Sequence, residues 1–252
     1  MAIDKVYDSL LDYLGQNGIK VGEIDTLVNY RNLTEEQALE QLFIISEFHK
    51  KIMGYNGYMN IRLDNKTGRM IEQYKIYNKK LKRDIKKIKL NTPENQFEEL
   101  LLEIGDVYLE RAENCIEEIY KWDYIDLISR SMQRVELCLG CTDFNHIAKD
   151  ESIVISTLNN CCYNMVEIDC VYFINKLKKK GLTMNWESLI YKYCDFEGLE
   201  CKSAKFISGL VSYPYEFMKC CSRYRENKKD WDELKYKEKL LKIIERDNYN
   251  LI

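Results

Sequence analysis

Two long segments with helical periodicity occupy the middle of the chain and restrict the folds open to it. Apolar residues recur every three or four positions in both, the pattern of an amphipathic helix. In the first segment they are Tyr74, Tyr77, Leu81, Ile85 and Ile88, and in the second Phe97, Leu101, Ile104, Tyr108, Ala112, Cys115 and Ile119. We expect Thr92 to cap the second helix, with Pro93 at its first position. The sequence therefore predicts an antiparallel helical hairpin.

The two predicted helices carry opposite charge. Residues 75–89 contain seven Lys and one Arg against one Asp, whereas residues 94–118 contain eight Glu and one Asp against one Arg. Pairing across the hairpin favours this register, although an exposed pair contributes only about 0.2–1 kcal/mol. A nucleic-acid surface is the alternative interpretation of the basic run. Because its charges interleave with a core stripe, a solvated helix face beside an acidic helix is favoured.

Cap signals predict helices in the remaining segments as well. Thr34 and Gln37 form a capping-box pattern before an apolar stripe that runs from Leu39 to Ile52. Further helices are expected over residues 4–14, 165–180, 186–193 with Asn185 as cap, 215–224 after Pro214, and from Asp230 and Glu233 to Ile244. Only two prolines interrupt the chain, so the predicted fold class is mainly α.

Composition excludes several classes of protein. The net charge of −3 gives no general attraction to nucleic acid or to anionic membranes. The first residues are already polar, which argues against a secretory leader, and no apolar run approaches the roughly 20 residues that span a bilayer. We therefore expect a cytoplasmic protein whose ten cysteines are made as free thiols.

The segment from Leu137 to Asn164 has the order of a phosphoryl-transfer site. Asp143-Phe144-Asn145-His146 precedes an apolar strand predicted over Ile153–Leu158, and Asn159 follows that strand. Such a site needs a carboxylate to orient the acceptor, an amide and an acid to hold Mg²⁺, and a lysine on the nucleotide phosphates. Asp143 fits the first role. A loop carboxylate that accepts hydrogen bonds from neighbouring backbone amides is the alternative for Asp143.

The other positions of that site lack the required chemistry. Ala148, five residues after Asp143, has no ligand atom, and Asn159 offers a neutral amide where a carboxylate is needed. No glycine-rich phosphate loop occurs in the sequence. The sequence therefore predicts degenerate site positions at Asp143, Ala148 and Asn159, no catalytic residue, and no cofactor.

Cysteines and histidines near this segment suggest two further chemistries. Cys138 and Cys141, with Cys161, Cys162 and nearby His146, are compatible with zinc, but the adjacent second pair points its side chains apart, so no metal site is predicted. A cysteine nucleophile would need a histidine partner. His49, on the stripe of a predicted helix, is expected to be a satisfied core histidine.

The sequence resembles the CotS-like spore coat proteins of the aminoglycoside phosphotransferase-like kinase superfamily over residues 36–246. The matching segments are Leu42–Met53, Gly68-Arg69-Met70 with the helices that follow, Asp143-Phe144-Asn145-His146, the series Cys161, Asn164 and Asp169, and Tyr213–Phe217 with Trp231. The resemblance implies the helical C-lobe of a kinase-like fold, with one small β-hairpin near residues 152–160.

The chain departs from this family where the chemistry resides. The family's His-Gly before the catalytic Asp is Cys141-Thr142 here, its metal Asn falls on Ala148, and its metal Asp falls on Asn159. A second register aligns Gly140 with the family's Gly and places Cys141 at the catalytic Asp. Residues 1–33 contain no run of alternating strands. We expect them to replace the family's N-lobe, with residues 34–252 forming the helical domain.

The resemblance and its departures predict a non-catalytic pseudokinase with a structural or scaffolding role of the spore-coat type. Its partners are expected to be other proteins, either coat components or further copies of this chain, and not nucleic acid or membrane. The alternative is a residual small-molecule phosphotransferase that uses Asp143 as its base. The amphipathic helix Lys5–Leu14 is expected to fold back over the surface that an N-lobe would cover.

Overall fold

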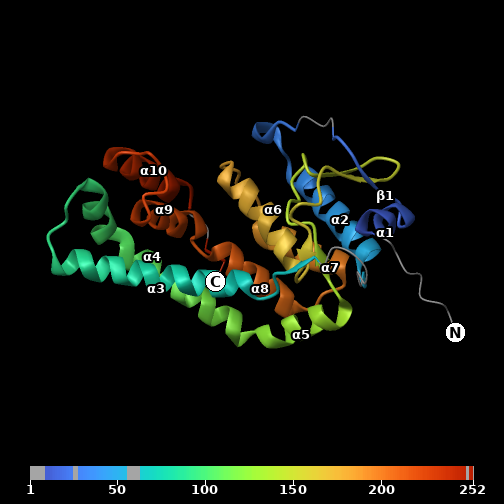
Figure 1. The fold of residues 1–252 in the computed structure, drawn as a ribbon, viewed down its shortest axis with the longest axis horizontal. Coiled ribbons are helices and arrows are strands. Elements are labelled where there is room, and N and C mark those ends of the chain that lie inside the picture. Colours follow the sequence, from blue (N-terminus) through green and yellow to red (C-terminus); the bar gives the residue numbers. More distant parts are fainter. Residues whose placement is uncertain (1–8, 25–27, 56–62, 248–249, 252) are drawn as a thin grey trace. The chain divides into compact units, whose positions relative to one another are not determined.

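The computed structural model describes residues 9–24, 28–55, 63–247 and 250–251, which form two compact units (Figure 1). Unit 1 comprises Met1–Gly68 and Asp123–Ile207, and unit 2 comprises Arg69–Trp122 and Ser208–Ile252. The described residues contain ten α-helices and six strands of two or three residues, so the mainly helical prediction is confirmed. None of the described helices combines the length and hydrophobicity that a bilayer crossing requires.

Unit 1 contains the strands and more than half of the helices. Its helices are α1 (Leu10–Gln16), the 3₁₀ turn η1 (Tyr30–Asn32), α2 (Glu35–Ile52), α5 (Tyr124–Arg134), α6 (Glu167–Lys179), α7 (Trp186–Glu197) and the first part of α8 (Cys201–Ser212). Its strands are β1 (Ile19–Val21), β2 (Asp64–Asn65), β3 (Leu137–Cys138), β4 (Ile147–Lys149), β5 (Ile153–Ile155) and β6 (Cys162–Tyr163).

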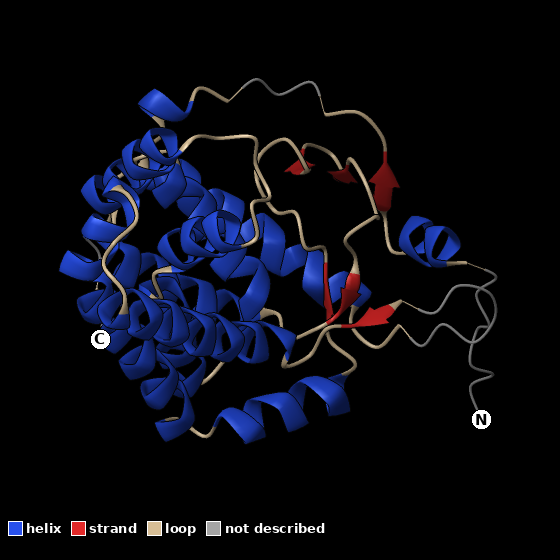
Figure 2. Cartoon of the chain, turned by 60° about the vertical axis from the view of Figure 1, so that its left-hand side comes forward, coloured by secondary structure: helices blue, strands red, loops and turns tan. Residues whose placement is uncertain are grey.

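The strands form two three-stranded sheets, shown in red in Figure 2. In the first, β5 pairs antiparallel with β4, opposing Ile155 to Ile147, and parallel with β1, opposing Ile153 to Ile19. In the second, β6 lies between β2 and β3. The predicted hairpin near residues 152–160 thus begins earlier, at Ile147, and its second strand ends at Ile155. The second sheet was not predicted, because strands of two residues are too short to show alternation.

Helix α2 lies at the centre of unit 1. The capping box at Thr34 is confirmed, because its hydroxyl accepts from the Gln37 amide at 3.2 Å while the Gln37 side chain accepts from the Thr34 amide at 3.1 Å. Leu42, Ile45 and Phe48 are fully buried and contribute to the core of the unit. Helix α2 packs against α6, α7, β3 and β4, and therefore holds the loop between the last two strands in place.

Unit 2 is built on the predicted hairpin, α3 (Arg69–Leu90) and α4 (Gln96–Lys121), with the end of α8, α9 (Tyr215–Arg225) and α10 (Glu233–Arg246). A Cβ on Gly105 of α4 would lie 2.9 Å from the Ile85 side chain, so glycine permits the close approach of the two helices. The predicted pairing is confirmed by Lys82 with Glu113, 3.3 Å, and by Lys89 with Asp106, 2.5 Å.

Two helix starts in unit 2 differ from prediction by two or three residues. Asn95, not Thr92, caps α4, because its side chain accepts from the amides of Phe97 and Glu98. Asp232, not Asp230, caps α10 and accepts from the Lys235 amide at 2.7 Å. In both cases a second capping residue lies nearer to the first buried side chain of the helix. Pro214 precedes α9 as predicted.

Helices α5 and α8 were not predicted from the sequence. Helix α5 follows Asp123, whose φ of 54° is left-handed and whose side chain makes no capping bond, and it ends at Val135, with φ of 52°. Asp123 is a common cap residue but does not cap α5 with its side chain, and Val135 is not a residue that usually marks the end of a helix. The tertiary structure therefore determines where α5 begins and ends.

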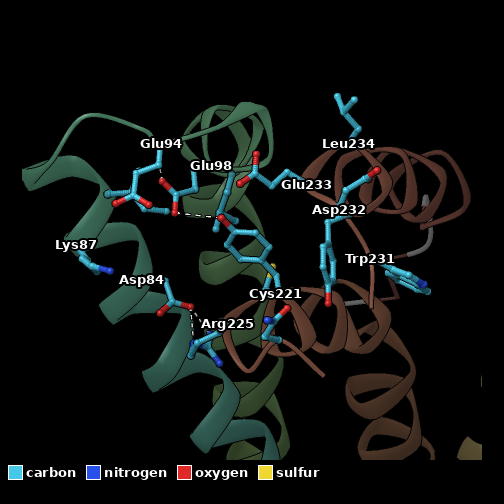
Figure 3. Close-up of a pocket in the computed structure, with 15 residues that line it drawn as sticks. Asp84, Lys87, Glu94, Glu98, Cys221, Arg225, Trp231, Asp232, Glu233 and Leu234 are labelled. Carbon is cyan, nitrogen blue, oxygen red and sulfur yellow. Dashed lines mark hydrogen bonds and ion pairs between the residues drawn. The ribbon is translucent and has the colours of Figure 1, made fainter. Parts of the chain in front are cut away.

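A cavity of about 710 Å³ opens in unit 2 where α3, α4, α9 and α10 meet (Figure 3). Its lining residues come from the end of α3, the beginning of α4, the end of α9 and the beginning of α10. The cavity is thus separate from the loops of unit 1 that carry the site predicted from the sequence.

Candidate functional site

The candidate site is the loop between β3 and β4 in unit 1, and Asp169 in the first turn of α6 fixes its course. One Asp169 carboxylate oxygen accepts from the Leu139 amide at 2.7 Å, and the other from the Gly140 amide at 2.9 Å. Gly140 has a φ of 77°, and a Cβ there would lie 2.7 Å from the Asn160 carbonyl oxygen. Only glycine therefore fits this turn without displacing backbone.

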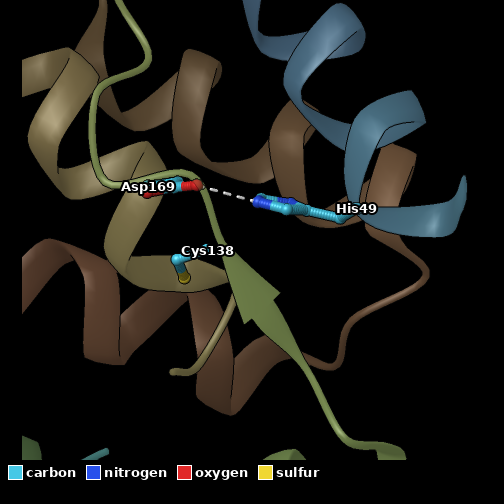
Figure 4. Close-up of side chains that lie close together, drawn as sticks. All are labelled: His49, Cys138 and Asp169. Atoms are coloured by element: carbon cyan, nitrogen blue, oxygen red, sulfur yellow. Dashed lines mark hydrogen bonds and ion pairs between the residues drawn. The ribbon is translucent and has the colours of Figure 1, made fainter. Parts of the chain in front are cut away.

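His49 connects Asp169 to Glu197 in the core of unit 1. Its Nε2 lies 3.0 Å from an Asp169 carboxylate oxygen (Figure 4). Its Nδ1 lies 2.6 Å from a Glu197 oxygen. Burial would lower the pKa of His49, but the two carboxylates outweigh burial and raise it to about 10. The imidazole is therefore protonated at neutral pH, and both nitrogens donate. The prediction of a satisfied core histidine is confirmed.

His49, Cys138 and Asp169 also form the group of potential metal ligands in the described residues, with ligand atoms within 4.8 Å of one another. Their chemistry does not fit a metal. A doubly protonated imidazole has no free lone pair. The Cys138 sulfur lies 3.0 Å from the Met165 carbonyl, and burial, followed by the negative charge of Asp169, raises the pKa of its thiol. Of the cysteines considered for zinc in the sequence, this group contains Cys138 alone.

Asp143 lies in the same loop, and its carboxylate is already engaged. One oxygen accepts from the Asn145 amide at 3.1 Å and contacts His146 Nδ1 at 2.9 Å, while the other lies 3.1 Å from Lys176 Nζ. Burial would raise the pKa of Asp143, but the bonds from His146 and Lys176 lower it below its ordinary value. A carboxylate with a lowered pKa is a weak base. These contacts match the alternative of a structural loop carboxylate.

Tyr30, in the turn before α2, packs over this loop. Its ring meets Phe144 edge to face, with centroids 6.2 Å apart, and Phe144 in turn meets Phe173. The Tyr30 hydroxyl is buried and has no hydrogen-bond partner in the described structure. Burial, with the negative charge of Asp143, raises the pKa of Tyr30 to about 12. Tyr30, which precedes α2, therefore covers part of the loop that carries Asp143.

The remaining predicted positions are dispersed around the loop. Cys141, which follows the fixed Gly140, is half-buried and accepts from the Asn160 side chain at 2.9 Å. Ala148 lies in β4 opposite Val154. Asn159 is exposed, and its backbone amide donates to the Thr157 hydroxyl. In the described structure no hydrogen bond or ion pair joins Asn159 to Asp143.

Sequence reasoning missed a second buried charge cluster in unit 1. Arg130 of α5 lies 3.2 Å from Glu136 and 2.8 Å from Glu167, and it donates to the Ser203 hydroxyl at 3.0 Å. The two carboxylates are fully buried. The sequence gives no signal for this cluster, because Arg130 and Glu167 lie 37 positions apart. Likewise, Asp169 is predicted only through the family resemblance, and the sequence gives no signal that Glu197 lies near Asp169.

Comparisons with known proteins relate the chain to a fold without placing it in a family. No known family profile matches the sequence, and no curated protein matches it. The structure is similar to that of an aminoglycoside phosphotransferase from Alicyclobacillus acidocaldarius, with a TM-score of 0.69 at 9% identity, covering 90% of this chain and 66% of that one. The chain thus has the kinase-like fold of an aminoglycoside phosphotransferase and spans about two thirds of that protein's length.

Proposed function

We propose that this chain is a non-catalytic protein of kinase-like fold with a structural or scaffolding role of the spore-coat type. The observation that carries the proposal is the state of Asp143. Its carboxylate is bonded to Asn145, His146 and Lys176, and its pKa is lowered, which opposes a role as the base of a phosphoryl transfer.

The positions expected to hold Mg²⁺ support the same conclusion. Ala148 and Asn159 contribute no carboxylate, and in the described structure no hydrogen bond joins Asn159 to Asp143. In such transfers, positioning and the electrostatic stabilisation supplied by metal ions, which carboxylates hold in place, provide most of the catalysis. If Gly140 is aligned with the family's Gly, Cys141 takes the place of the catalytic Asp, and the negative charge of that Asp is lost at this position too.

Residues before α2 support the proposed replacement of an N-lobe by the segment 1–33. Strand β1 extends the β5–β4 pair, and Tyr30 covers Phe144 beside Asp143. Helix α1, expected over Lys5–Leu14, is observed from Leu10 to Gln16, and residues 4–8 lie outside the described residues. The Tyr13 hydroxyl donates to the Met53 carbonyl at 3.2 Å. We propose that residues 9–24 and 28–33 cover the site instead of admitting a nucleotide.

Protein partners are the expected ligands of such a scaffold. Helix α5 carries Ile125 and Met132, 62% and 61% exposed, seven residues apart and hence on one face. Contiguous exposed apolar surface marks contact sites, so we propose this face of α5 as one place where a partner would dock. If the chain is a coat component, antibodies against it detect it in the coat fraction of spores from its source. Its restriction to the spore interior would contradict the coat assignment.

Nucleotide-dependent stability tests the absence of catalysis. We expect the melting temperature to stay unchanged with ATP or GTP, with and without Mg²⁺, and no release of inorganic phosphate or ADP with an aminoglycoside acceptor. A nucleotide at 100 times its Kd would add about 2.7 kcal/mol, a readily measured shift.

A matched pair of variants separates the proposal from a residual phosphotransferase. Asp143→Asn removes the carboxylate expected to act as the base of a residual phosphotransferase, whereas Asp150→Asn changes an exposed carboxylate in the turn between β4 and β5. Turnover that Asp143→Asn abolishes and Asp150→Asn preserves would establish an enzyme and overturn the proposal.

A further inference from the structure

The cavity in unit 2 has the size and lining of a small ligand site. Its volume of about 710 Å³ lies within the range of about 300–1,000 Å³ that is common for such sites. Ile88, Leu101 and Cys221 contribute buried apolar surface, and the rings of Tyr224 and Trp231 also line it. An aliphatic stem can therefore pack on carbon and aromatic surface within the cavity.

The charged side chains around this cavity are mostly negative. Five carboxylates and two cationic side chains line it: Asp84, Glu94, Glu98, Asp232 and Glu233, with Lys87 and Arg225. Arg225 is paired with Asp84, and Asp232 accepts from the Lys235 amide as the cap of α10. In the described structure Glu94, Glu98 and Glu233 have no ion-pair partner. The carboxylates that remain thus favour a cationic ligand.

Glu98 is held in place by neutral donors only. One of its oxygens accepts from the Tyr224 hydroxyl at 3.3 Å, and the other from the Glu94 amide at 2.9 Å. Asn95 donates to the same Tyr224 hydroxyl at 2.7 Å. Burial raises the pKa of Tyr224, and Glu98 and Glu233 add to this effect, so both carboxylates act on one hydroxyl. Two acids therefore converge beside an aromatic ring without a cation between them.

Figure 3 shows Glu94 and Glu98 on one side of the cavity, with Glu233 reaching toward them from α10 and Trp231 on the far side. Lys87 lies on the same side as Glu94 and can partly screen it. The space near Glu98 and Glu233 is therefore the more negative part. Carboxylates in a cavity with an apolar floor are the chemistry that recognises an alkylammonium group, through ion pairing with its head and burial of its stem.

We propose that the unit 2 cavity binds a primary alkylammonium group, with its head near Glu98 and Glu233 and its stem along Tyr224 and Trp231. Linear polyamines and lysine side chains carry this chemistry. Acids in the first turn of a helix are also stabilised by the helix dipole. That effect accounts for the presence of Glu98 and Glu233, but not for the aromatic, apolar-floored cavity on which they converge. The site is independent of whether unit 1 transfers phosphate.

Calorimetric titration of the full chain at low salt tests this site in two arms. One arm uses spermidine, and the other uses an acetylated, amidated Gly-Lys-Gly peptide with the Gly-norleucine-Gly peptide as its neutral match. Binding in the first arm alone identifies a free polyamine, binding in the second alone identifies a lysine side chain of a partner, and binding in both identifies the shared group. Absence of binding in both arms at millimolar concentrations overturns the proposal.

Variants distinguish the cavity from general charge attraction. We expect Glu98→Gln with Glu233→Gln to weaken binding at least tenfold. Glu103→Gln with Glu110→Gln removes the same charge from exposed positions of α4 outside the cavity and should change affinity less than twofold. Tyr224→Phe, which leaves all charges in place but frees Glu98, should cause an intermediate loss. Equal losses in the two double variants, with unchanged melting temperatures, would show non-specific attraction and exclude the site.

Discussion

The loop of unit 1 and the cavity of unit 2 both contain several carboxylates, but they use them in opposite ways. In unit 1 the carboxylates of Asp143, Asp169 and Glu197 all contact a cationic group, namely Lys176 for Asp143 and the His49 imidazolium for the other two. In unit 2 Glu98 and Glu233 face open space with neutral partners or none. A carboxylate that is already neutralised stabilises the fold, whereas an unpaired one at a cavity is available to a ligand.

Replacing His49 should have the largest effect on stability. His49→Leu leaves Asp169 and Glu197 buried without the cation between them, and breaking a buried pair costs about 3–5 kcal/mol. Urea unfolding followed by circular dichroism at pH 7 measures this loss. The other histidine is the control, because His146 is half-exposed and its replacement by Ala should cost about 1 kcal/mol or less. Equal losses would show that the charge network does not stabilise unit 1.

The same network predicts a loss of stability at alkaline pH. The pKa of His49 is raised to about 10 in the folded state, above its ordinary value of 6.5. The free energy of unfolding that the charged His49 contributes is fully present below pH 6.5. It is lost as pH rises toward 10, at a rate of up to about 1.4 kcal/mol per pH unit. Unfolding free energies from pH 6 to 10 should therefore fall more steeply for the wild type than for His49→Leu. Parallel curves would contradict a charged His49.

Gly140 tests how rigidly the loop of unit 1 is held. Gly140→Ala combines a left-handed backbone with a Cβ 2.7 Å from the Asn160 carbonyl oxygen. Gly181 is the matched control, because it has a similar φ of 83° but open space around the added Cβ. We expect Gly181→Ala to cost about 1–2 kcal/mol from backbone strain, and Gly140→Ala to cost about 1–3 kcal/mol more from overpacking. Equal melting temperatures would mean that the loop relaxes freely.

Asp143 gives a smaller effect with a characteristic pH dependence. Asp143→Asn removes the ion pair with Lys176 and weakens the contact with His146, both partly exposed, and should cost about 1 kcal/mol at pH 7. Because the pKa of Asp143 is lowered in the folded state, its contribution is present above the ordinary value of 3.8 and is lost as pH falls through the lowered value. The variant and the wild type should therefore converge in acid unfolding. A variant more stable than the wild type at pH 7 would indicate a strained, functional carboxylate.

Glu98 should give the smallest change in stability. Because Glu98 has neutral partners only, Glu98→Gln should alter the unfolding free energy by less than about 0.5 kcal/mol. Glu103→Gln, at an exposed position of the same helix, provides the reference value. Thermal unfolding in the absence of ligand measures both. A loss as large as that of Asp143→Asn would place Glu98 among the structural carboxylates and remove the contrast between the two units.

Much of the helical framework could be predicted because its signals are local. The stripes of α3 and α4, the capping box at Thr34, the cap at Asn185 and the position of Pro214 each depend on residues within a few turns of one another. Local competition accounts for the errors: Asn95 and Asp232 displaced the predicted caps Thr92 and Asp230. The predicted boundary between residues 1–33 and 34–252 stays a prediction.

The sequence alone determined most of the helices, the opposed charges of the hairpin, and the lack of carboxylates at Ala148 and Asn159, because periodicity, capping and side-chain chemistry are local properties. The tertiary structure alone decided that His49 lies between Asp169 and Glu197, 120 and 148 positions away along the chain. The tertiary structure also pairs β1 with β5 and brings Glu98 and Glu233 to the lining of one cavity. Such contacts depend on how packed helices meet in space, which no spacing along the chain encodes.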